Sequence, residues 1–415
     1  MRNSGFLWVV VGIMILLDIY IYQAIKVVLP TSSPRVRSTI IIIYWFFSAL
    51  SVITLAVLPY LNYESWPRMV RTYLFAIVVG LFFSKLLAAV FLAIDDIRRG
   101  GMWLLGKLFS NPSVSNSPWA VGMPRSTFFS WLGLAAGGGL FGTLLYGFGN
   151  KYRYHVNRVQ LAFDNLPLAF KGMKIVQLSD IHSGSFTDKK AVEKGVELAL
   201  AQKPDLILFT GDLVNDRATE MADYMDVFSK LKAPMGVYST LGNHDYGDYV
   251  RWESQEIKQA NLEHLKRIHG EMGWRLLMNE NTILEKDGQQ IVLIGIENWS
   301  ARGNFPKYGK MKEAYSGAEQ FPFKILMSHD PSHWDAQVRP EYPAIDLMLA
   351  GHTHGMQFGL EVPGFKWSPV QYIYKQWAGL YEEGKQKLYV NRGFGFIGYP
   401  GRVGILPEIT VIELV

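Results

Sequence analysis

The sequence predicts a chain of two parts: an all-α transmembrane region of four helices, followed by an α/β domain in which helices flank two packed mixed β-sheets. Residues 1–150 are strongly apolar, whereas residues 151–415 have the composition of a soluble domain. In this second part, runs of Val, Ile and Leu alternate with polar, helix-permissive stretches, and helices become rarer toward the end. A length of 415 residues suits two or three such domains.

Four stretches of the first part are long and apolar enough to cross a bilayer, which takes about 20 residues. They cover roughly residues 5–29, 39–58, 70–94 and 127–148. The run of residues 40–47 has no polar face, which argues against helices buried in a soluble domain. The first stretch is too long for a signal peptide and lacks a small-residue cleavage site before Pro30. We therefore expect an integral, multi-pass protein in contact with the lipid bilayer.

Two ionisable residues interrupt these spans, Asp18 in the first and Lys85 in the third. Charges inside a bilayer are costly and usually face a bundle interior, so the two side chains are candidates for a pair. The alternative is that Lys85 extends to the membrane surface and Asp18 lies near an interface. Lys and Arg residues near the spans divide equally between the two sides, so the positive-inside rule does not place the second domain.

Charge and cysteine content exclude several functions. The net charge of +5 is small for this length and no dense Lys/Arg run occurs, so we expect no nucleic-acid partner. The chain contains no cysteine, which excludes disulfides, thiolate metal sites and a cysteine nucleophile.

The second part is expected to contain eight strands and three helices. The strands are predicted at residues 173–178, 206–209, 236–240, 291–296, 324–327, 345–349, 387–390 and 409–413. The helices are predicted at residues 189–202, 219–231 and 251–272.

Polar residues follow five of these strands at the point where each strand ends. They are Asp180 and His182, then Asp212, then Asn243, His244 and Asp245, then His329, and finally His352 and His354. A single His or Asp after a strand is usually a cap or turn residue. Five such junctions, each with a small neighbour and together holding five of the nine histidines, favour one shared site at the carboxyl ends of the strands.

The side chains at these junctions suit divalent metal ions. Carboxylates, imidazoles and one amide oxygen are ligands for Mn²⁺, Fe or Zn²⁺. Seven candidate ligands are too many for one ordinary site but suffice for two ions that share a carboxylate. Such pairs of ions activate a bridging water and act on phosphoryl groups, so no Ser, Thr or Cys nucleophile is needed.

In this order, the motifs resemble the calcineurin-like metallophosphoesterase superfamily, whose pattern is D-x-H, G-D, G-N-H-D/E, a lone H and G-H-x-H. The resemblance covers about residues 170–415 and implies a four-layer sandwich. The "GHTHG" block at 351–355 and the ending at 391–414 resemble the bacterial membrane-associated branch, which includes pyrophosphatases of the UDP-2,3-diacylglucosamine type. Met356 departs from that branch, which often has glycine after this block.

The resemblance also implies a role for each residue. Asp180, His182 and His354 bind the first ion, Asp212 bridges, and Asn243, His329 and His352 bind the second. His244 is the catalytic residue that stabilises or protonates the reacting phosphoryl group. Asp245 orients His244.

We therefore expect a membrane-anchored hydrolase that cleaves a phosphoester or pyrophosphate bond with a metal-bridging hydroxide. Its two divalent ions are expected to be Mn²⁺, with Fe and Zn²⁺ as alternatives. The expected substrate is lipid-linked or a nucleotide-lipid, and the expected location is a bacterial inner membrane. The alternatives are a phosphodiesterase or phosphatase acting on a soluble nucleotide or phosphate ester, and a non-catalytic membrane scaffold. The aromatic segment 358–381 either enters the membrane interface or packs as an ordinary core element.

Overall fold

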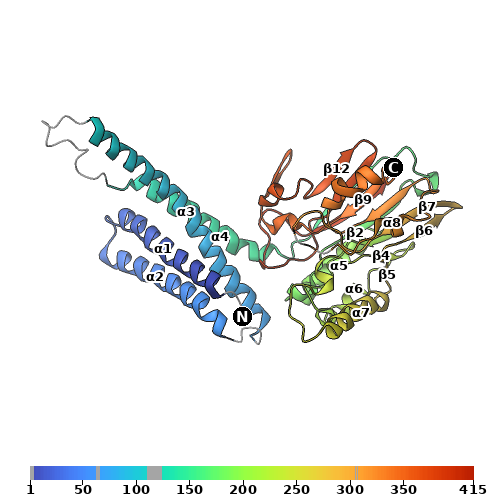
Figure 1. Ribbon diagram of the computed structural model, residues 1–415, viewed down its shortest axis with the longest axis horizontal. Coiled ribbons are helices and arrows are strands. Elements are labelled where there is room, and N and C mark those ends of the chain that lie inside the picture. Colours follow the sequence, from blue (N-terminus) through green and yellow to red (C-terminus); the bar gives the residue numbers. More distant parts are fainter. Residues whose placement is uncertain (1–3, 62–65, 110–123, 304, 306) are drawn as a thin grey trace. The chain divides into compact units, whose positions relative to one another are not determined.

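The computed structural model describes residues 4–61, 66–109, 124–303, 305 and 307–415. The chain divides into two compact units, Met1–Tyr146 and Gly147–Val415. The division falls close to the change from apolar to mixed composition near residue 150. Figure 1 shows a helical first unit and a second unit with two β-sheets.

The first unit consists of four long helices in its described residues. They are α1 (Ser4–Val28), α2 (Pro34–Val57), α3 (Arg68–Phe109) and α4 (Thr127–Gly147). All four are long and apolar enough to cross a membrane, so the protein is an integral, multi-pass membrane protein. Helix α3 continues well beyond residue 94, the predicted end of its span. Its charged continuation is stabilised by pairs one turn apart, Asp95 with Arg98 and Asp96 with Arg99.

The two charges inside the spans form a pair, as one of the two sequence interpretations predicted. Lys85 Nζ lies 2.5 Å from Asp18 Oδ1, and the two residues are only 8% and 2% exposed. Ser48 donates a second hydrogen bond to the same carboxylate at 2.9 Å, and Tyr44 donates to the Asp18 backbone carbonyl at 2.7 Å. The alternative, in which Lys85 extends to the membrane surface, is wrong. The pair joins α1, α2 and α3 through polar contacts within their apolar interior.

The second unit contains two six-stranded mixed sheets. In the first, the order is β1 (His155–Leu161), β14 (Glu408–Leu414), β2 (Lys174–Leu178), β3 (Leu206–Phe209), β4 (Val237–Ser239) and β5 (Arg275–Leu276). In the second, it is β12 (Gly379–Glu383), β13 (Gln386–Val390), β9 (Leu347–Ala350), β8 (Lys324–Met327), β7 (Gln289–Gly295) and β6 (Glu280–Lys286). A separate hairpin pairs β10 (Leu360–Val362) with β11 (Phe365–Trp367). Strands β2 to β5 run parallel to one another, as do β7, β8, β9 and β13.

Apolar side chains on alternate positions of the strands form three buried layers. One face of each sheet contributes to a shared core, for example through Leu208 of β3 and Leu293 of β7. The other face of the first sheet packs on α5 (Lys189–Leu200) and α7 (Gln255–Glu271), for example through Val176. The outer face of the second sheet packs on the short helix α8 (Met311–Tyr315) and on the turn Trp334–Val338, which precedes the one-turn helix α9 (Arg339–Glu341). The predicted four-layer sandwich of sheets and helices is confirmed.

The helix predicted at 219–231 is wrong as a single element. A 3₁₀ turn, Ala218–Met221, is followed by the one-turn helix α6, Met225–Phe228. Ala218, Met221, Tyr224 and Val227 are buried at a spacing of three, the 3₁₀ period, but Phe228 beside Val227 is buried as well. The buried positions therefore follow no single helical period across the stretch.

Candidate metal centre

The five predicted junctions lie together at one end of the two sheets. Asp180 and His182 follow β2, Asp212 follows β3, and Asn243 and His244 follow β4, all in the first sheet. His329 follows β8 and the pair His352 and His354 follows β9, in the second sheet. Because parallel strands end at the same edge of a sheet, and the two sheets pack face to face, both edges supply side chains to one place.

The backbone of these loops is unusual. Asp180, His182, Asp212, His352 and His354 all have φ between 49° and 70°, in the left-handed region. Such a conformation costs a non-glycine residue roughly 1–2 kcal/mol. Strained residues of this kind cluster at functional sites because the surrounding structure holds them there. Here the loops are held by backbone bonds such as Asp180 N–H to the Gly211 carbonyl, at 2.9 Å.

Two glycines allow the loops to approach closely. A Cβ on Gly351 would lie 2.0 Å from Ser179 Oγ and 2.2 Å from Asp180 Oδ2. A Cβ on Gly242 would lie 2.2 Å from Asp212 Oδ1. Any side chain at these positions would therefore displace a carboxylate or its neighbour, which accounts for the glycine in the G-H-x-H and G-N-H-D blocks.

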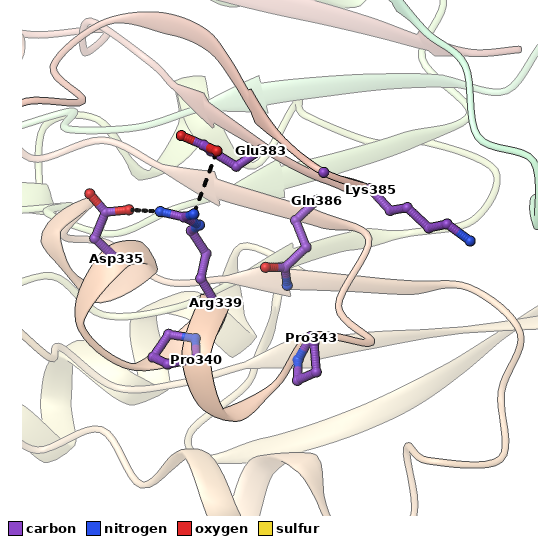
Figure 2. A pocket seen from close by; sticks show the side chains of 8 residues that line it. Asp335, Arg339, Pro340, Pro343, Glu383, Lys385 and Gln386 are labelled. Atoms are coloured by element: carbon purple, nitrogen blue, oxygen red, sulfur yellow. Dashed lines mark hydrogen bonds and ion pairs between the residues drawn. The ribbon is translucent and has the colours of Figure 1, made fainter.

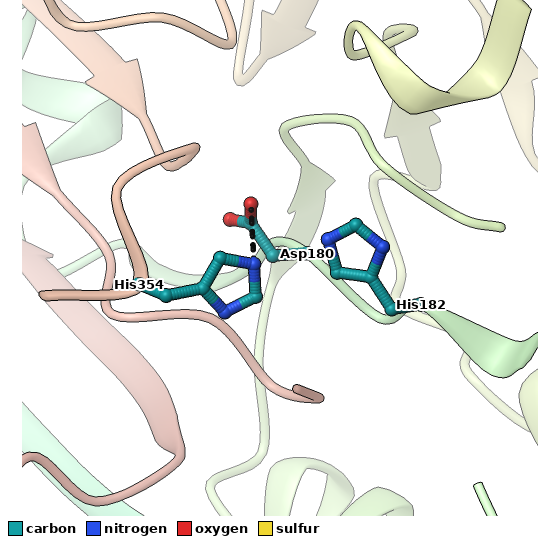
Figure 3. Close-up of side chains that lie close together, drawn as sticks. All are labelled: Asp180, His182 and His354. Carbon is teal, nitrogen blue, oxygen red and sulfur yellow. Dashed lines mark ion pairs between the residues drawn. The ribbon is translucent and has the colours of Figure 1, made fainter. Parts of the chain in front are cut away.

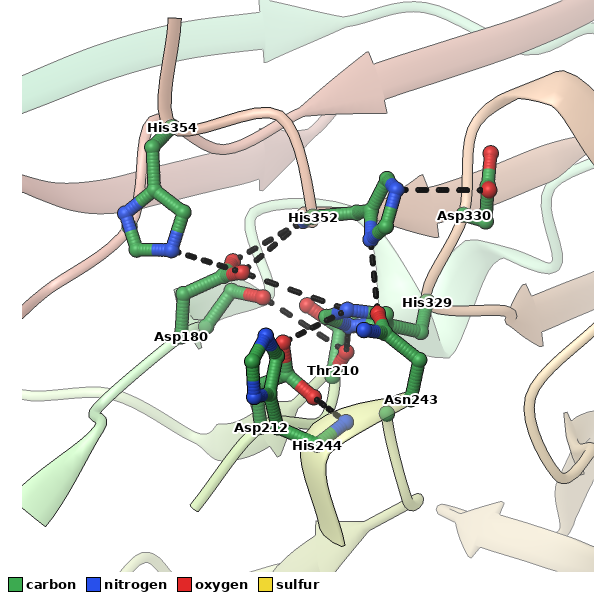
Figure 4. Close-up of polar contacts among 12 residues, drawn as sticks. Asp180, Thr210, Asp212, Asn243, His244, His329, Asp330, His352 and His354 are labelled. Carbon is green, nitrogen blue, oxygen red and sulfur yellow. Dashed lines mark hydrogen bonds and ion pairs between the residues drawn. The ribbon is translucent and has the colours of Figure 1, made fainter. Parts of the chain in front are cut away.

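The side chains form two adjacent groups, each with its ligand atoms within 4.8 Å of one another. Asp180, His182 and His354 make the first group, shown in Figure 3. Asp212, His329 and His352 make the second, shown with its neighbours in Figure 4. Asn243 Oδ1 lies 2.8 Å from His352 Nδ1 and so adjoins the second group.

The two groups are in contact through Asp212. Its Oδ2 lies 3.1 Å from His329 Nε2 of its own group and 3.5 Å from His182 Nε2 of the other. The structure therefore brings together all seven residues that the sequence predicted as ligands.

Burial and mutual charge determine the protonation of the site. Burial alone would raise the pKa of Asp180 and Asp212, but adjacent imidazoles hold both pKa values below the usual range. Burial lowers the pKa of His182, as it does for His352 and His354. Burial also disfavours the charged form of His329, yet Asp212 and Asp180 raise the pKa of that imidazole to about 10. The carboxylates are thus charged at neutral pH, and His182, His352 and His354 are neutral and able to bind a cation, whereas a cation at His329 would have to displace its proton.

The buried ring nitrogens of the histidines give a further reason why these residues fit divalent cations. In the described part of the chain, His182 Nδ1 is buried without a hydrogen-bond partner, and the buried Nε2 atoms of His182, His329 and His354 face only Asp212 and Asp180, which are themselves candidate ligands. A buried polar atom without a partner costs about 1–3 kcal/mol of folding free energy, and a cation bound by these nitrogens would offset that cost. The other ring nitrogen of His329 lies 2.7 Å from the Thr210 carbonyl, which fixes Nε2 as the atom that faces the site.

The prediction that Asp245 contacts and orients His244 is wrong. His244 Nδ1 lies 2.8 Å from the backbone carbonyl of Asn215, a partner that the sequence did not indicate. The carboxylate of Asp245 instead accepts four backbone N–H bonds, from Gly242, Asp212, Leu213 and Val214, at 2.8–3.3 Å. Burial and the charge of Asp212 raise its pKa to about 7. Asp245 therefore joins the loops after β3 and β4 and does not orient the imidazole.

Two further residues contact His352 that sequence reasoning missed. Tyr374 donates a hydrogen bond to Asp330 Oδ2 at 3.2 Å, and its hydroxyl oxygen lies 2.9 Å from His352 Nε2. Asp330 Oδ2 itself lies 3.5 Å from His352 Nε2. These contacts hold the ring so that its other nitrogen, Nδ1, faces Asn243. Asp330 directly follows His329 in the sequence, which is a local signal, but nothing near Tyr374 in the sequence indicates its contact.

Part of the aromatic segment 358–381 is an ordinary core element, as one of the two sequence interpretations predicted. Tyr374 and Trp377 are buried in a small core with Val370 and Ile405. The hairpin β10–β11 and the turn after it carry apolar side chains on the surface. These are Leu360, Val362, Phe365, Tyr372 and Ile373, each 47–78% exposed.

A surface cavity of about 580 Å³ lies elsewhere in the second unit, between α9 and the β12–β13 turn (Figure 2). The guanidinium of Arg339 on its wall is paired with two carboxylates, Asp335 at 2.7 Å and Glu383 at 3.5 Å. None of the metal-centre residues lines it.

Comparison with known proteins agrees with this geometry. A family model described as "Calcineurin-like phosphoesterase" matches residues 173–356, and one described as "Probable Calcineurin-like phosphoesterase, transmembrane domain" matches residues 1–150. The chain is 31% identical over 246 residues to phosphodiesterase YaeI of Escherichia coli, which covers 58% of this chain and 82% of YaeI. The chain belongs to the calcineurin-like metallophosphoesterases. It is thus a membrane-anchored metallophosphoesterase that carries a transmembrane domain and two His/Asp groups suited to a dinuclear metal centre.

Two further relatives show how this family varies. A transmembrane protein with metallophosphoesterase domain from Danio rerio is 29% identical over 318 residues, which cover 75% of this chain and 67% of the relative. The UDP-2,3-diacylglucosamine pyrophosphatase LpxG of Chlamydia trachomatis is 27% identical over 282 residues, which cover 56% of this chain and 81% of LpxG.

Proposed function

We propose that this metallophosphoesterase hydrolyses a phosphoester or pyrophosphate bond in a lipid-linked substrate, with the help of two divalent cations. The observation that supports a two-cation site is the pair of adjacent buried groups that share Asp212 and leave imidazole nitrogens unpaired. Two cations in such a site lower the pKa of water and offset the negative charge of a phosphoryl group.

In this proposal each cation has its own ligands. Asp180, His182 and His354 hold the first; Asn243, His329 and His352 hold the second; Asp212 contacts both. The mixed imidazole and carboxylate set suits Mn²⁺, with Fe and Zn²⁺ as the alternatives. The conformation of the G-H-x-H turn supports the division, because His352 and His354 belong to different groups although they are only two residues apart.

His244 is the proposed proton donor. Its Nδ1–H donates to the Asn215 carbonyl, so Nε2 is the ring atom left to meet a substrate. Its backbone N–H donates to Asp212 Oδ1 at 2.8 Å, which places the ring beside the shared carboxylate. The side chain is partly exposed, unlike those of the first ligand group. A protonated His244 can therefore stabilise phosphoryl charge and protonate the leaving oxygen.

The lipid-linked substrate is supported by the surface next to the centre. The exposed apolar hairpin β10–β11 begins three residues after Gln357, at the end of the turn that carries His354. An exposed apolar surface of this kind suits contact with acyl chains or the membrane interface. Membrane anchoring also raises the local concentration of a lipid substrate. The relative LpxG acts on a diacylated sugar nucleotide by its name, whereas the name of YaeI states only a phosphodiesterase. A soluble phosphodiester is therefore the second candidate.

Hydrolysis of bis(p-nitrophenyl) phosphate by the full chain in mild detergent tests the catalytic part. After treatment with chelator, activity should return with added Mn²⁺. Asp212→Ala should remove activity, and His244→Ala should lower it by about 10²–10⁴-fold. His264→Ala, on helix α7 and outside the centre, is the matched control and should keep full activity. Full activity in His244→Ala would contradict its role, and no metal-dependent hydrolysis at all would favour a non-catalytic scaffold.

The choice of substrate requires a second comparison. We expect a higher kcat/KM for UDP-2,3-diacylglucosamine than for the same sugar nucleotide without acyl chains. Phe365→Ser should reduce only the acylated rate if the hairpin contacts acyl chains. Equal rates on both compounds, unchanged by Phe365→Ser, would favour the soluble substrate.

A further inference from the structure

The helical unit contains a groove of its own. It has a volume of about 550 Å³ and is lined by residues from α1, α2, α3 and α4. Most of the lining is aliphatic or aromatic, with Ile21, Ile43 and Phe141 as examples. A volume of this size is within the range of pockets for small molecules. Among the described residues, the polar side chains on its wall are Tyr44, Ser48, Ser84 and Lys85.

The polar part of the wall carries no net charge. Lys85 is paired with Asp18 at 2.5 Å and donates to Ser48 Oγ at 3.0 Å, so a negatively charged group gains little from this ammonium. Ser84 differs from its neighbours. It is only 5% exposed, and its Oγ has no hydrogen-bond partner in the described part of the chain. An unpaired hydroxyl in an apolar environment is costly, so the groove suits a molecule that supplies one uncharged acceptor.

Helix α4 leaves this space open at one position. A Cβ on Gly137 would lie 2.5 Å from the Ser84 carbonyl, and a Cβ on Gly133 would lie 2.9 Å from the Ala88 carbonyl, so these glycines allow close contact between α3 and α4. Gly138 also lines the groove, but a Cβ there would have no atom within 4 Å. The space beside Gly138 is therefore not needed for helix packing.

We propose that this groove binds a single uncharged lipid, whose hydrocarbon chain lies along the Ile and Phe side chains and whose acceptor oxygen, such as an ester carbonyl, accepts the hydrogen bond of Ser84. The bound lipid would fill an apolar space between four helices and satisfy the unpaired hydroxyl. This site is independent of the metal centre and of the proposed reaction.

Photoactivatable diacylglycerol and phosphatidic acid with the same chains test the proposal on the full chain in mild detergent. We expect diacylglycerol to label peptides that line the groove, and phosphatidic acid to label them at least tenfold less, because a phosphate in the groove would lose its water and find Lys85 already paired. Gly138→Phe places a ring in the groove and should reduce the labelling at least tenfold. Gly139→Phe is the matched control, because its Cβ is equally free and the residue does not line the groove. Ser84→Ala should weaken the labelling about fivefold, the effect of one neutral hydrogen bond.

The outcomes separate the proposal from ordinary membrane contact. Unchanged labelling in Gly138→Phe, or equal labelling by phosphatidic acid, would overturn it, because lipids that merely surround the helices show neither dependence. Mn²⁺-dependent phosphodiester hydrolysis should be unchanged in Gly138→Phe and reports that the second unit is folded, while an unchanged thermal unfolding in detergent reports that the helical unit is folded.

Discussion

Replacing Asp245 by asparagine removes charge and one acceptor from the carboxylate that joins the loops after β3 and β4. One oxygen accepts from Gly242 and Asp212, at 2.8 and 2.9 Å, and the other from Leu213 and Val214, at 2.8 and 3.3 Å. In either orientation, the asparagine NH₂ would face two backbone N–H groups. Each buried donor left unpaired costs about 1–3 kcal/mol. We therefore expect a loss of about 4 kcal/mol, a large part of the roughly 5–15 kcal/mol that stabilises a typical protein.

Urea unfolding of the full chain in mild detergent at pH 8, above the pKa of about 7 for Asp245, measures this loss. Asp226→Asn is the control, because this exposed carboxylate forms a surface pair with Lys189 and its removal should cost no more than about 1 kcal/mol. If Asp245 instead acted by orienting His244, Asp245→Asn would lower activity and leave stability unchanged. Unfolding at the wild-type urea concentration would refute the structural role.

Three further predictions concern other buried contacts. Burial lowers the pKa of His269 to about 3. Between about pH 6.5 and pH 3 this imidazole is therefore protonated in the unfolded chain but not in the folded chain. The free energy of unfolding should fall by about 1.4 kcal/mol per pH unit as the pH drops through this range. In urea unfolding, His269→Leu should reduce the dependence of the free energy of unfolding on pH by the contribution of one proton. An unchanged dependence would contradict the assignment of this effect to His269. Lys85→Met should lower the free energy of unfolding by about 3–5 kcal/mol, measured by thermal unfolding in detergent, because it leaves the buried Asp18 carboxylate unpaired. The double variant Asp18→Asn/Lys85→Met should recover most of this loss. Equal losses in the single and the double variant would rule out the Asp18–Lys85 pair as the cause. Tyr374→Phe should weaken Mn²⁺ binding to chelator-treated protein about 10–100-fold by calorimetry, while the exposed Tyr372→Phe should not; equal affinities would exclude Tyr374 as a positioning residue.

Local sequence patterns predicted the elements that position the site. Short Val, Ile and Leu runs marked β2, β3, β8 and β9, and the polar residues that follow them are the ones that meet. Strand β1 was missed, because all its residues except Leu161 are exposed or partly exposed and they include Arg158 and Gln160. The end of α3 was also missed, since pairs such as Asp95 with Arg98 make charged residues compatible with a continuing helix.

Contacts to the backbone and contacts between distant residues could not be predicted in this way. The partners of Asp245 are backbone N–H groups, which every residue possesses, so no side-chain pattern marks them. Tyr374 reaches His352 across 22 positions, and buried Arg402 donates to the His354 carbonyl across 48. Such contacts depend on how loops fold back over the site, and single-sequence patterns carry no information on that.

The metal centre draws its side chains from both sheets, and this has a consequence for synthesis of the chain. The first predicted ligand is Asp180 and the last is His354, so the ribosome releases them 174 positions apart. Neither group can be complete before the turn after β9 has been made, because each needs a histidine of that turn. The two ligand groups therefore stay incomplete until His354 emerges, by which time the four helices have long been available for membrane insertion.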